Sequence, residues 1–428
     1  MNEYFLHYIW QFQYFDKINL RTSTGEEIII SNPGHRNTHS GPDFYDAKLK
    51  IGFIEWAGSV EIHIYSSGWR EHKHHDDAAY ENVVLHVVWD ENEQIIRRDG
   101  TVIPTLELKD RVSQAFLLQY KRIMHSRHKI PCANAIGLVP DLIKRSMLDK
   151  VLTSRLESKS NNILLALQKS NDDWEEVCYQ TLCKNFGFKV NSDPFLQLAQ
   201  SLPYKILMKH GDKLEQIEAL IFGQAGFLNE TIQDEYYLLL KREYNLLCKK
   251  FNLFDRKMNR AQWRFLRLRP ANFPSIRLAQ LASLLFHEKK LFSRIVSIKS
   301  LQELIQIFSV SPSGYWLHHY QFFKEQKKVV PSLGRASMEN IVINSIVPML
   351  VAYGKAKDDQ RCVDRALELL QEISSEENTI LRSWNELGLS SKTAFDSQAL
   401  IELHNNFCMK RRCLDCNIGF SLLQPAIR

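Results

Sequence analysis

Apolar and polar side chains alternate along the first quarter of the chain. Residues 47–51 and 60–65 both carry this two-residue period, which predicts strands with one buried face. Residues 83–89 are almost continuously apolar, as is typical of a central strand covered on both sides. We also expect a short strand at 27–30 and a hairpin between 95–97 and 102–108, turning at Asp99-Gly100.

Helical spacing takes over on either side of these strands. Phe5, Ile9 and Phe12 predict a helix over residues 3–15, and a short helix fits around residues 78–80. After about residue 110 the strand signal largely stops, and amphipathic patterns such as 142–167 and 235–251 predict long helices. The expected fold is an α/β domain over residues 1–130, followed by a mainly α-helical region over residues 131–428.

Composition is that of a soluble globular protein, with 44% hydrophobic and 24% charged residues among 428. No apolar run approaches the length of a membrane span and the N-terminus does not resemble a signal peptide, so we expect a cytoplasmic protein without membrane contact. The first 130 residues hold 15 basic against 18 acidic residues and ten of the fifteen histidines, whereas the remainder holds 40 basic against 31 acidic residues. This asymmetry suits a metal site beside a polyanion-binding surface, although solvated charges on two ordinary domains would give the same counts.

Candidate chemistry is concentrated at two of the predicted strands. Asp43 ends the loop before the first, in Gly41-Pro42-Asp43, and Glu61 and His63 are two residues apart on the next, so their side chains share a face. This order of helix, strand, Asp, strand, Glu-x-His, helix and strand resembles the core of the PD-(D/E)XK nucleases, over about residues 1–110. The resemblance implies a restriction-endonuclease-like mixed sheet flanked by helices, and it suggests Glu3, on the first helix, as a further acidic ligand.

A nuclease of this kind uses a hard cation to bind the phosphate and activate water. Two carboxylates suffice for Mg²⁺, which keeps several of its waters. The resemblance is incomplete, because His63 stands where the family usually has lysine. Histidine can relay a proton or bind a transition metal, so Mn²⁺ becomes an alternative to Mg²⁺.

Further polar candidates follow in the segment Trp69-x-x-His72-x-His74-His75-Asp76-Asp77. His72, His74 and Asp77 are candidates for extra metal ligands or phosphate contacts, and the alternative is a solvated polar loop. His86 lies within the apolar run, where a buried histidine with a satisfied hydrogen bond is the expected reading.

Three cysteines lie within nine residues, at Cys408, Cys413 and Cys416. With Cys132 or His404 as the fourth ligand, they would form a closed structural zinc site or hold an iron–sulfur cluster. We expect Cys132 to meet the other three, which would close a long loop. The alternative is three reduced cysteines near the end of the chain.

Basic residues are interleaved with aromatic ones between residues 256 and 277. Such a pattern is typical of nucleic-acid binding, where cations contact phosphates and rings stack on bases. The alternative is an amphipathic helix with core aromatics and solvated arginines. The candidate nucleic-acid contacts are Arg264, Arg267, Arg269 and Arg277.

A narrower resemblance covers nearly the whole chain. Its motifs are Trp10-Gln11-Phe12, Gly41-Pro42-Asp43-Phe44, Ser59 to His63, Trp69 to His74, Leu85 to Val88, and Arg269 to Pro274 with Arg277 and Gln280, together with the cysteine-bearing tail. They resemble the bacterial family called domain of unknown function 2851, which implies no activity. The leading hypothesis is a metal-dependent nuclease acting on DNA or RNA. The alternatives are an inactive nucleic-acid-binding or scaffold protein on the same fold, and a hydrolase of small phosphorylated metabolites.

Overall fold

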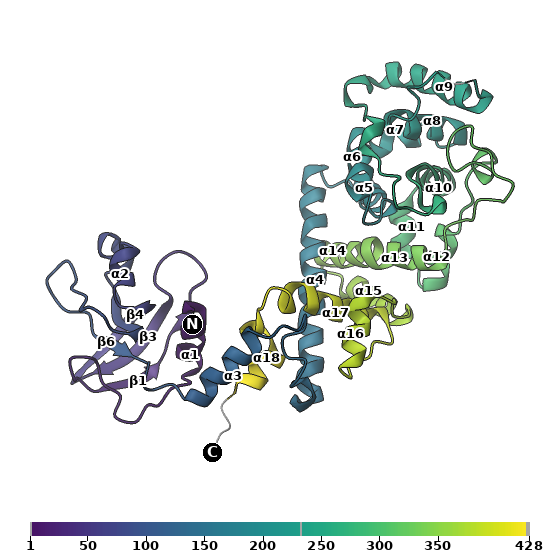
Figure 1. Ribbon diagram of the computed structural model, residues 1–428. Coiled ribbons are helices and arrows are strands. Elements are labelled where there is room, and N and C mark those ends of the chain that lie inside the picture. Colours follow the sequence, from purple (N-terminus) through teal and green to yellow (C-terminus); the bar gives the residue numbers. More distant parts are fainter. Residues whose placement is uncertain (1, 232, 425–428) are drawn as a thin grey trace. The chain divides into compact units, whose positions relative to one another are not determined.

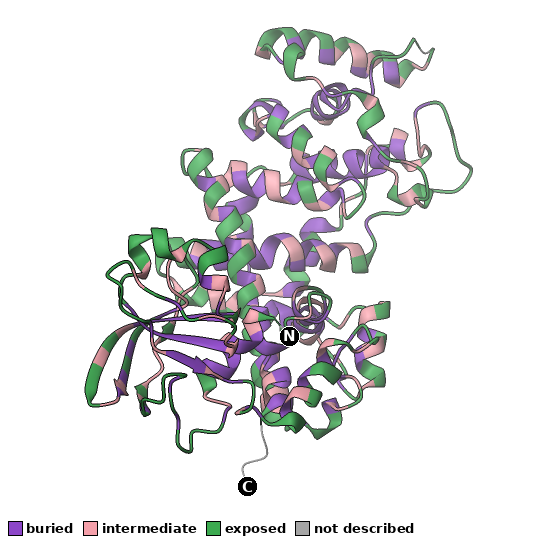
Figure 2. Ribbon diagram, turned by 60° about the vertical axis from the view of Figure 1, so that its left-hand side comes forward, coloured by how far each residue is buried: buried purple, intermediate pink, exposed green. Residues whose placement is uncertain are grey.

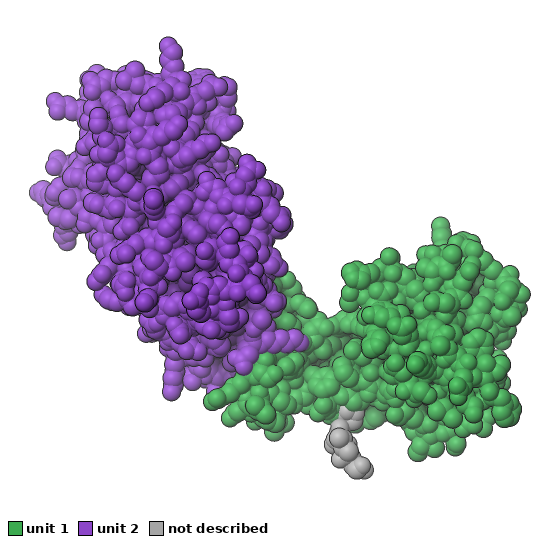
Figure 3. Space-filling view, turned by 180° about the vertical axis from the view of Figure 1, so that it is seen from behind, with its two compact units in different colours: residues 1–147, 403–428 green, residues 148–402 purple. Residues whose placement is uncertain are grey.

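The computed structural model describes residues 2–231 and 233–424, which form two compact units (Figure 3). The first unit comprises Met1–Met147 and Leu403–Arg428, and the second comprises Leu148–Glu402. The boundaries fall within helices α4 (Asp141–Lys169) and α17 (Ala394–Leu403). The α/β region and the helical region expected from the sequence are therefore both present, but the C-terminal segment belongs to the first unit rather than to the helical one.

A six-stranded mixed sheet is the centre of the first unit (Figure 1). The strand order is β1-β3-β4-β5-β6, with β2 pairing to β3. Pairing is antiparallel between β1, β3 and β4, and parallel between β4, β5 and β6. The strands are β1 (Ile28–Asn32), β2 (His35–Arg36), β3 (Phe44–Ile51), β4 (Ile54–Tyr65), β5 (Val83–Asp90) and β6 (Thr105–Glu107).

The alternating pattern correctly predicted β3 and β4, and the apolar run correctly predicted β5. The expected hairpin after β5 forms in part: the Arg97 N–H donates to the Thr101 oxygen at 2.8 Å and the Ile103 N–H to the Ile95 oxygen at 3.0 Å. Its turn exists, with Gly100 at φ +84°, but its arms join through one bridge, between Ile96 and Val102. Thr105–Glu107 pairs in parallel with β5 instead, because the edge of β5 offers a longer ladder than the hairpin does.

Helix α1 (Glu3–Phe12) covers part of the sheet by packing on β4. The Asn2 side chain caps its first turn, and Gln13, at φ +52°, ends it earlier than expected. The C-terminal segment contributes α18 (Asn417–Leu423), which lies beside α3 (Gln114–Met124) in Figure 1. The Phe420 ring contacts Phe12, with centroids 4.8 Å apart, which explains why residues 403–424 belong to this unit.

The remaining helix of the sheet domain is α2 (Gly68–Glu71), followed by the short 3-10 turns η1 (His74–Asp76) and η2 (Ala78–Tyr80). These elements connect β4 to β5 and so form the crossover between two parallel strands. The η2 turn confirms the short helix expected around residue 79. Residues 59–63 of β4 and 83–88 of β5 are buried, and Figure 2 shows such buried stretches of the sheet in purple.

The second unit is helical, and the amphipathic patterns predicted two of its principal helices, α4 and α9 (Glu235–Phe251). Helix α10 (Pro274–His287) is buried from Pro274 to Leu285 and packs against α8 and α5. The other helices are α5 (Trp174–Phe186), α6 (Ser192–Ser201), α7 (Tyr204–Met208), α8 (Leu214–Gln224), α11 (Leu291–Ser297), α12 (Leu301–Phe308), α13 (Arg335–Ile341), α14 (Val347–Lys357), α15 (Gln360–Glu372) and α16 (Thr379–Glu386).

One helical stretch, Arg335–Lys357, is long and apolar enough to cross a membrane, judged by length and composition over the described residues. It contains α13 and α14, joined by a π-helical turn. Within its apolar window 67% is buried inside the protein. This is the burial of a core helix, in keeping with the expectation of no membrane contact.

Candidate metal centre

The polar centre begins where β3 and β4 run side by side. Asp43 directly precedes β3, and the pairing of Phe44 with Val60 places it next to Glu61 on β4. The backbone N–H of Asp43 donates to Glu61 Oε2 at 3.1 Å. In return, the N–H of Ile62 donates to Asp43 Oδ2 at 3.0 Å. The two carboxylates that the sequence singled out therefore meet, although they are 18 residues apart.

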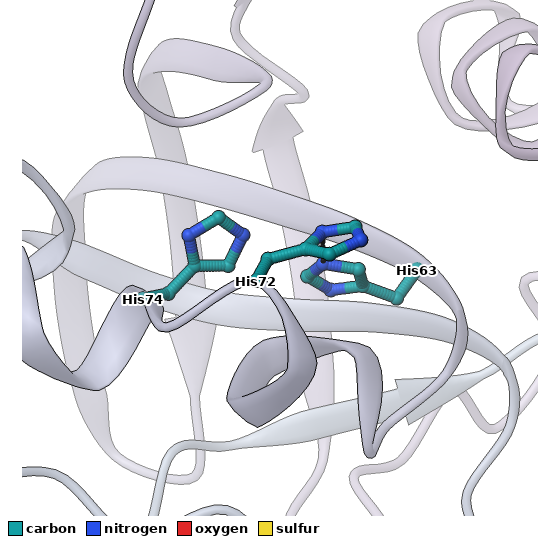
Figure 4. A group of neighbouring side chains, drawn as sticks. All are labelled: His63, His72 and His74. Atoms are coloured by element: carbon teal, nitrogen blue, oxygen red, sulfur yellow. Dashed lines mark hydrogen bonds between the residues drawn. The ribbon is translucent and has the colours of Figure 1, made fainter.

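His63 links this carboxylate pair to further histidines. Its Nδ1 lies 2.9 Å from Nε2 of His86 on β5, and its Nε2 lies 3.2 Å from Nδ1 of His72, just after α2. With His74 in η1, one ligand nitrogen from each of His63, His72 and His74 lies within 4.8 Å of the others (Figure 4). The segment after β4 thus brings two histidines over a third.

His74 closes the ring of contacts around Glu61. Its Nε2 lies 3.1 Å from Glu61 Oε1, while His63 Nε2 lies 3.8 Å from the same oxygen. The His74 ring stacks on Tyr80, with centroids 3.8 Å apart. His63 is buried, His74 is half-buried and His72 is exposed, so solvent and small molecules reach the cluster from the His72 side.

Helix α1 contributes a histidine rather than the acid that the family resemblance suggested. His7 Nε2 lies 3.2 Å from Asp43 Oδ2. In the described structure no hydrogen bond or ion pair joins Glu3 to Asp43, Glu61 or His63. His7 lies four residues after Glu3 on the same helix, so its helical face was available from the sequence, but its contact with Asp43 was not.

Burial sets the charge state of the inner residues. Glu61, His63 and His86 are 4%, 2% and 0% exposed. Desolvation raises the pKa of Glu61. Desolvation is the largest cause of a lowered pKa at both His63 and His86, and neighbouring imidazoles are the next cause. The pKa of His86 falls to about 3. Both imidazoles are therefore neutral near pH 7, which is the form that binds metals.

Some buried nitrogen atoms in and beside the cluster have no hydrogen-bond partner in the described structure. His86 was expected to be a buried histidine with its bonds complete. Its Nε2 does have a partner, but its buried Nδ1 has none, and the Trp69 indole N–H is also without one. If the Nδ1–H of His63 donates to His86, the Nε2 of His63 carries a lone pair, which points toward the exposed His72. Three converging imidazoles with an adjacent carboxylate fit a transition metal, whereas Mg²⁺ prefers oxygen ligands.

Gly68 makes room for this arrangement at the start of α2. A Cβ atom at this position would lie 2.6 Å from His63 Cδ2 and 2.9 Å from His63 Cγ. These distances are shorter than real Cβ contacts allow. The His63 ring thus occupies the space that any larger residue at position 68 would need.

A pocket of about 350 Å³ adjoins the cluster. Arg97 and Arg98 line it together with the acidic Glu81 and Asp99, and Arg98 is paired with Glu81 at 3.6 Å. Tyr80 supplies a partly exposed aromatic face beside the buried Trp69, and His74 is shared with the cluster. Asp77 also lines the pocket and caps η2 by accepting from the Ala79 N–H at 2.9 Å. Asp77 was a candidate from the sequence, whereas both arginines were not, because Arg97-Arg98 beside an Asp-Gly turn looks like ordinary turn chemistry.

All four predicted metal-ligand cysteines are buried and belong to the first unit. Burial and then the nearby Cys416 and Cys413 raise the pKa of Cys132 to about 12. Arg411 donates to the backbone oxygens of Ser126 and His128, at 2.7 and 3.2 Å, and so ties the tail to the segment before Cys132. Among the described residues, however, three ligand atoms within 4.8 Å occur only in the histidine cluster. The cysteines are neighbours in a looser arrangement than a closed zinc site, and His404 Nδ1 pairs with Asn405 instead.

The predicted nucleic-acid residues separate into two groups. Arg264, Arg267 and Arg269 are exposed, and no acidic partner lies within 4.0 Å of them in the described structure. Arg277, by contrast, is 5% exposed and lies in the core. The alternative of one amphipathic helix is wrong for residues 256–273, which form short 3-10 turns, although Trp263 is buried as that alternative expected.

The fold and centre together define a protein with an α/β unit, a histidine-rich candidate metal site and a separate helical unit. The chain belongs to the family described as protein of unknown function (DUF2851), whose model matches residues 3–379. No curated protein and no solved structure matches the chain.

Proposed function

We propose that the first unit is a metal-dependent phosphodiesterase that acts on nucleic acid. The observation that carries this proposal is the convergence of His63, His72 and His74 beside the Asp43–Glu61 pair. Neutral imidazoles favour a transition metal, so Mn²⁺ or Zn²⁺ is proposed in preference to Mg²⁺. A bound metal would supply an activated water and stabilise charge on the phosphate.

Each side chain around the histidine cluster has its own role in the proposed reaction. Glu61 orients His74 through its Oε1, and the backbone N–H of Asp43 holds Glu61 through its Oε2. His7 is positioned beside Asp43. Arg97, which has no acidic partner within 4.0 Å among the described residues, would contact a phosphate in the adjoining pocket, and the Tyr80 ring would offer a surface for a base.

Two further features favour a nucleic acid over a small metabolite. A mixed sheet that is antiparallel at β1, β3 and β4 and parallel at β4, β5 and β6 agrees with the proposed PD-(D/E)XK relationship. In addition, the exposed Arg264, Arg267 and Arg269 would contact a polyanion. DNA and RNA are both candidate substrates.

The test is to strip the full-length protein with a chelator and reload it with Mg²⁺, Mn²⁺ or Zn²⁺. Single-stranded, duplex and branched DNA and RNA are then assayed beside bis(4-nitrophenyl) phosphate, a diester, and 4-nitrophenyl phosphate, a monoester. We expect diester cleavage with Mn²⁺ or Zn²⁺, and a loss of at least about 100-fold in His72→Ala and Asp43→Asn. His125→Ala is the control, because His125 is exposed at the end of α3 and belongs neither to the histidine cluster nor to the lining of the adjoining pocket.

The outcomes separate the proposed activity from its alternatives. Cleavage of the monoester alone would indicate a metabolite phosphatase. Metal binding that depends on His72 without any cleavage, but with retained nucleic-acid binding, would indicate an inactive binding protein on the same fold. Equal activity in the wild type and in His72→Ala would contradict the proposal, because the activity would then arise elsewhere.

We also propose that Cys132, Cys408, Cys413 and Cys416 close around a structural zinc ion or iron–sulfur cluster. Their burial in one unit and mutual electrostatic influence support this. Metal binding would draw the thiolates together and lower their pKa values. Elemental analysis and an absorption spectrum are expected to show one zinc ion, which is colourless, or one brown iron–sulfur cluster more in the wild type than in Cys413→Ser. Cys362→Ser is the control, since Cys362 lies in the second unit. An unchanged metal content in Cys413→Ser would contradict the proposal.

A further inference from the structure

A second pocket, of about 210 Å³, lies within the helical unit. Its walls come from the end of α5, the loop before α6, and the segment leading into α10. Much of the lining is apolar, and the charged residue that lines it is Arg277 of α10. Its mouth includes Val190, whose side chain is 39% exposed. The apolar part of the wall consists of Phe186, Phe188, Val190, Phe195, Leu268 and Pro274.

Arg277 is a buried cation with only neutral partners. Its NH1 donates to Gln280 Oε1 at 3.0 Å and its NH2 to Asn272 Oδ1 at 2.6 Å, while its Nε has no partner. Among the described residues, no carboxylate lies within 4.0 Å of the guanidinium. Burial lowers its pKa to about 10, so it remains charged at neutral pH. An uncompensated buried charge is costly, and bound anions are one way to offset that cost.

The loop that faces this arginine is held in an unusual conformation. Phe188 has a backbone φ of +48°, which an aromatic residue rarely adopts, and its ring lies 4.6 Å from the guanidinium carbon of Arg277. The loop is fixed by Asn191, whose side chain exchanges two hydrogen bonds with the Arg264 backbone, both at 2.9 Å. Strained backbone of this kind concentrates at ligand sites.

We propose that this pocket binds a small organic oxyanion, a carboxylate or phosphate monoester carried on a planar apolar group. The oxyanion would pair with the unused N–H groups of Arg277, with Asn272 and Ser337 beside it. The apolar group would lie among the phenylalanine and proline side chains. This pocket belongs to the second unit, so the proposal is independent of the metal centre and of its activity.

Calorimetric titration of the full-length protein tests this with three probes of similar shape. Benzoate and phenyl phosphate are oxyanions on a ring, and benzamide is the neutral counterpart of benzoate. Val190→Trp fills the mouth from its exposed side and leaves Arg277 in place, whereas Arg277→Gln removes the charge. Leu246→Trp, at an exposed position of α9, is the matched control for a bulky substitution.

We expect at least one oxyanion to bind the wild type and Leu246→Trp with the same affinity. Binding should weaken at least about tenfold in Val190→Trp and Arg277→Gln, and benzamide should bind at least about tenfold more weakly than benzoate. Binding of phenyl phosphate alone would assign a phosphate monoester, and binding of both oxyanions would assign the broader class. If Arg277→Gln does not fold, Val190→Trp decides the question. Binding unaffected by Val190→Trp, equal binding of benzamide, or no binding by either oxyanion would overturn the proposal.

Discussion

The two units differ in the partners of their buried titratable groups. In the first unit Glu61, His63 and His86 are buried, and each contacts at least one other titratable group of the cluster. In the second unit Glu218 and Arg277 are equally buried, yet each is surrounded by neutral partners. The first arrangement concentrates ligand atoms at one point, whereas the second leaves single titratable groups without a charged partner.

The difference teaches what burial alone does not say about function. Groups that converge can share a cation or a proton, so their arrangement has a chemical use. An isolated buried charge has no such use by itself, and it needs either a change of protonation or a ligand. Glu218 changes its protonation, since burial raises its pKa to about 8. Arg277 cannot lose its charge in this way, because its guanidinium stays protonated at neutral pH.

The largest effect, on metal affinity, is expected from a substitution that crowds the histidine cluster but replaces none of its proposed metal ligands. Gly68→Ala would place a methyl group 2.6 Å from His63 Cδ2, and the His63 ring would have to turn away from His72. Loss of ligand orientation of this kind typically costs about 10- to 100-fold in metal affinity. Competition titration with a chromophoric chelator measures the change for Mn²⁺ and Zn²⁺.

Gly137→Ala provides the control for this substitution, because a Cβ atom there meets nothing within 4 Å. It should bind metal as the wild type does. Unfolding of Gly68→Ala should also be easier, by about 1–3 kcal/mol, since overpacking a buried site strains it. Wild-type metal affinity in Gly68→Ala would show that the position of the His63 ring does not matter for the centre.

A smaller effect is expected from the isolated acid of the second unit. Glu218 is protonated in the folded protein up to a pKa of about 8, but ionises near its ordinary value of 4.5 when unfolded. Its contribution to stability is therefore complete below about pH 4.5 and is lost as the pH rises toward 8. The slope approaches about 1.4 kcal/mol per pH unit within that window.

Glu218→Gln should remove this slope, because an amide replaces the neutral acid without titrating. The measurement is the unfolding midpoint of the full chain between pH 5 and pH 8, with the second-unit transition followed separately. Glu386→Gln, at the exposed end of α16 in the same unit, should keep the wild-type slope. Parallel pH profiles for the wild type and Glu218→Gln would rule out a protonated Glu218 in the fold.

The sequence predicted those parts of the molecule that depend on local patterning. Alternation located β3 and β4, and the two-residue spacing placed Glu61 and His63 on one face. Both side chains are buried, however, because residues after β4 fold back over that face. Which of the clustered histidines would return to His63 depends on the path of the β4–β5 crossover, and no periodicity describes that path.

Long-range packing accounts for the other differences. Helix α1 presents His7 to Asp43, and this depends on its rotation against β4. The C-terminal segment joins the first unit through ring contacts such as Phe420 with Phe12. Arg277 was grouped with the arginines before it, but it falls in a helix whose first three turns are buried on every side, and the nearly continuous apolar residues after it already indicate a buried helix.

The smallest effect is expected at the exposed arginines, which test whether the second unit also meets a polyanion. Arg264, Arg267 and Arg269 lack acidic partners in the described structure, so their charges are available to phosphates. Each contact with a phosphate releases a counterion, which contributes about 0.9 to the slope of log affinity against log salt for duplex DNA and about 0.7 for single strands. Each Arg→Ala change should therefore lower that slope by about this amount and weaken binding a few-fold. Arg335→Ala is the control, because Arg335 is already paired with Glu339 at 2.7 Å. Slopes that stay unchanged in the triple variant, measured by fluorescence anisotropy between 50 and 200 mM salt, would confine nucleic-acid contact to the first unit.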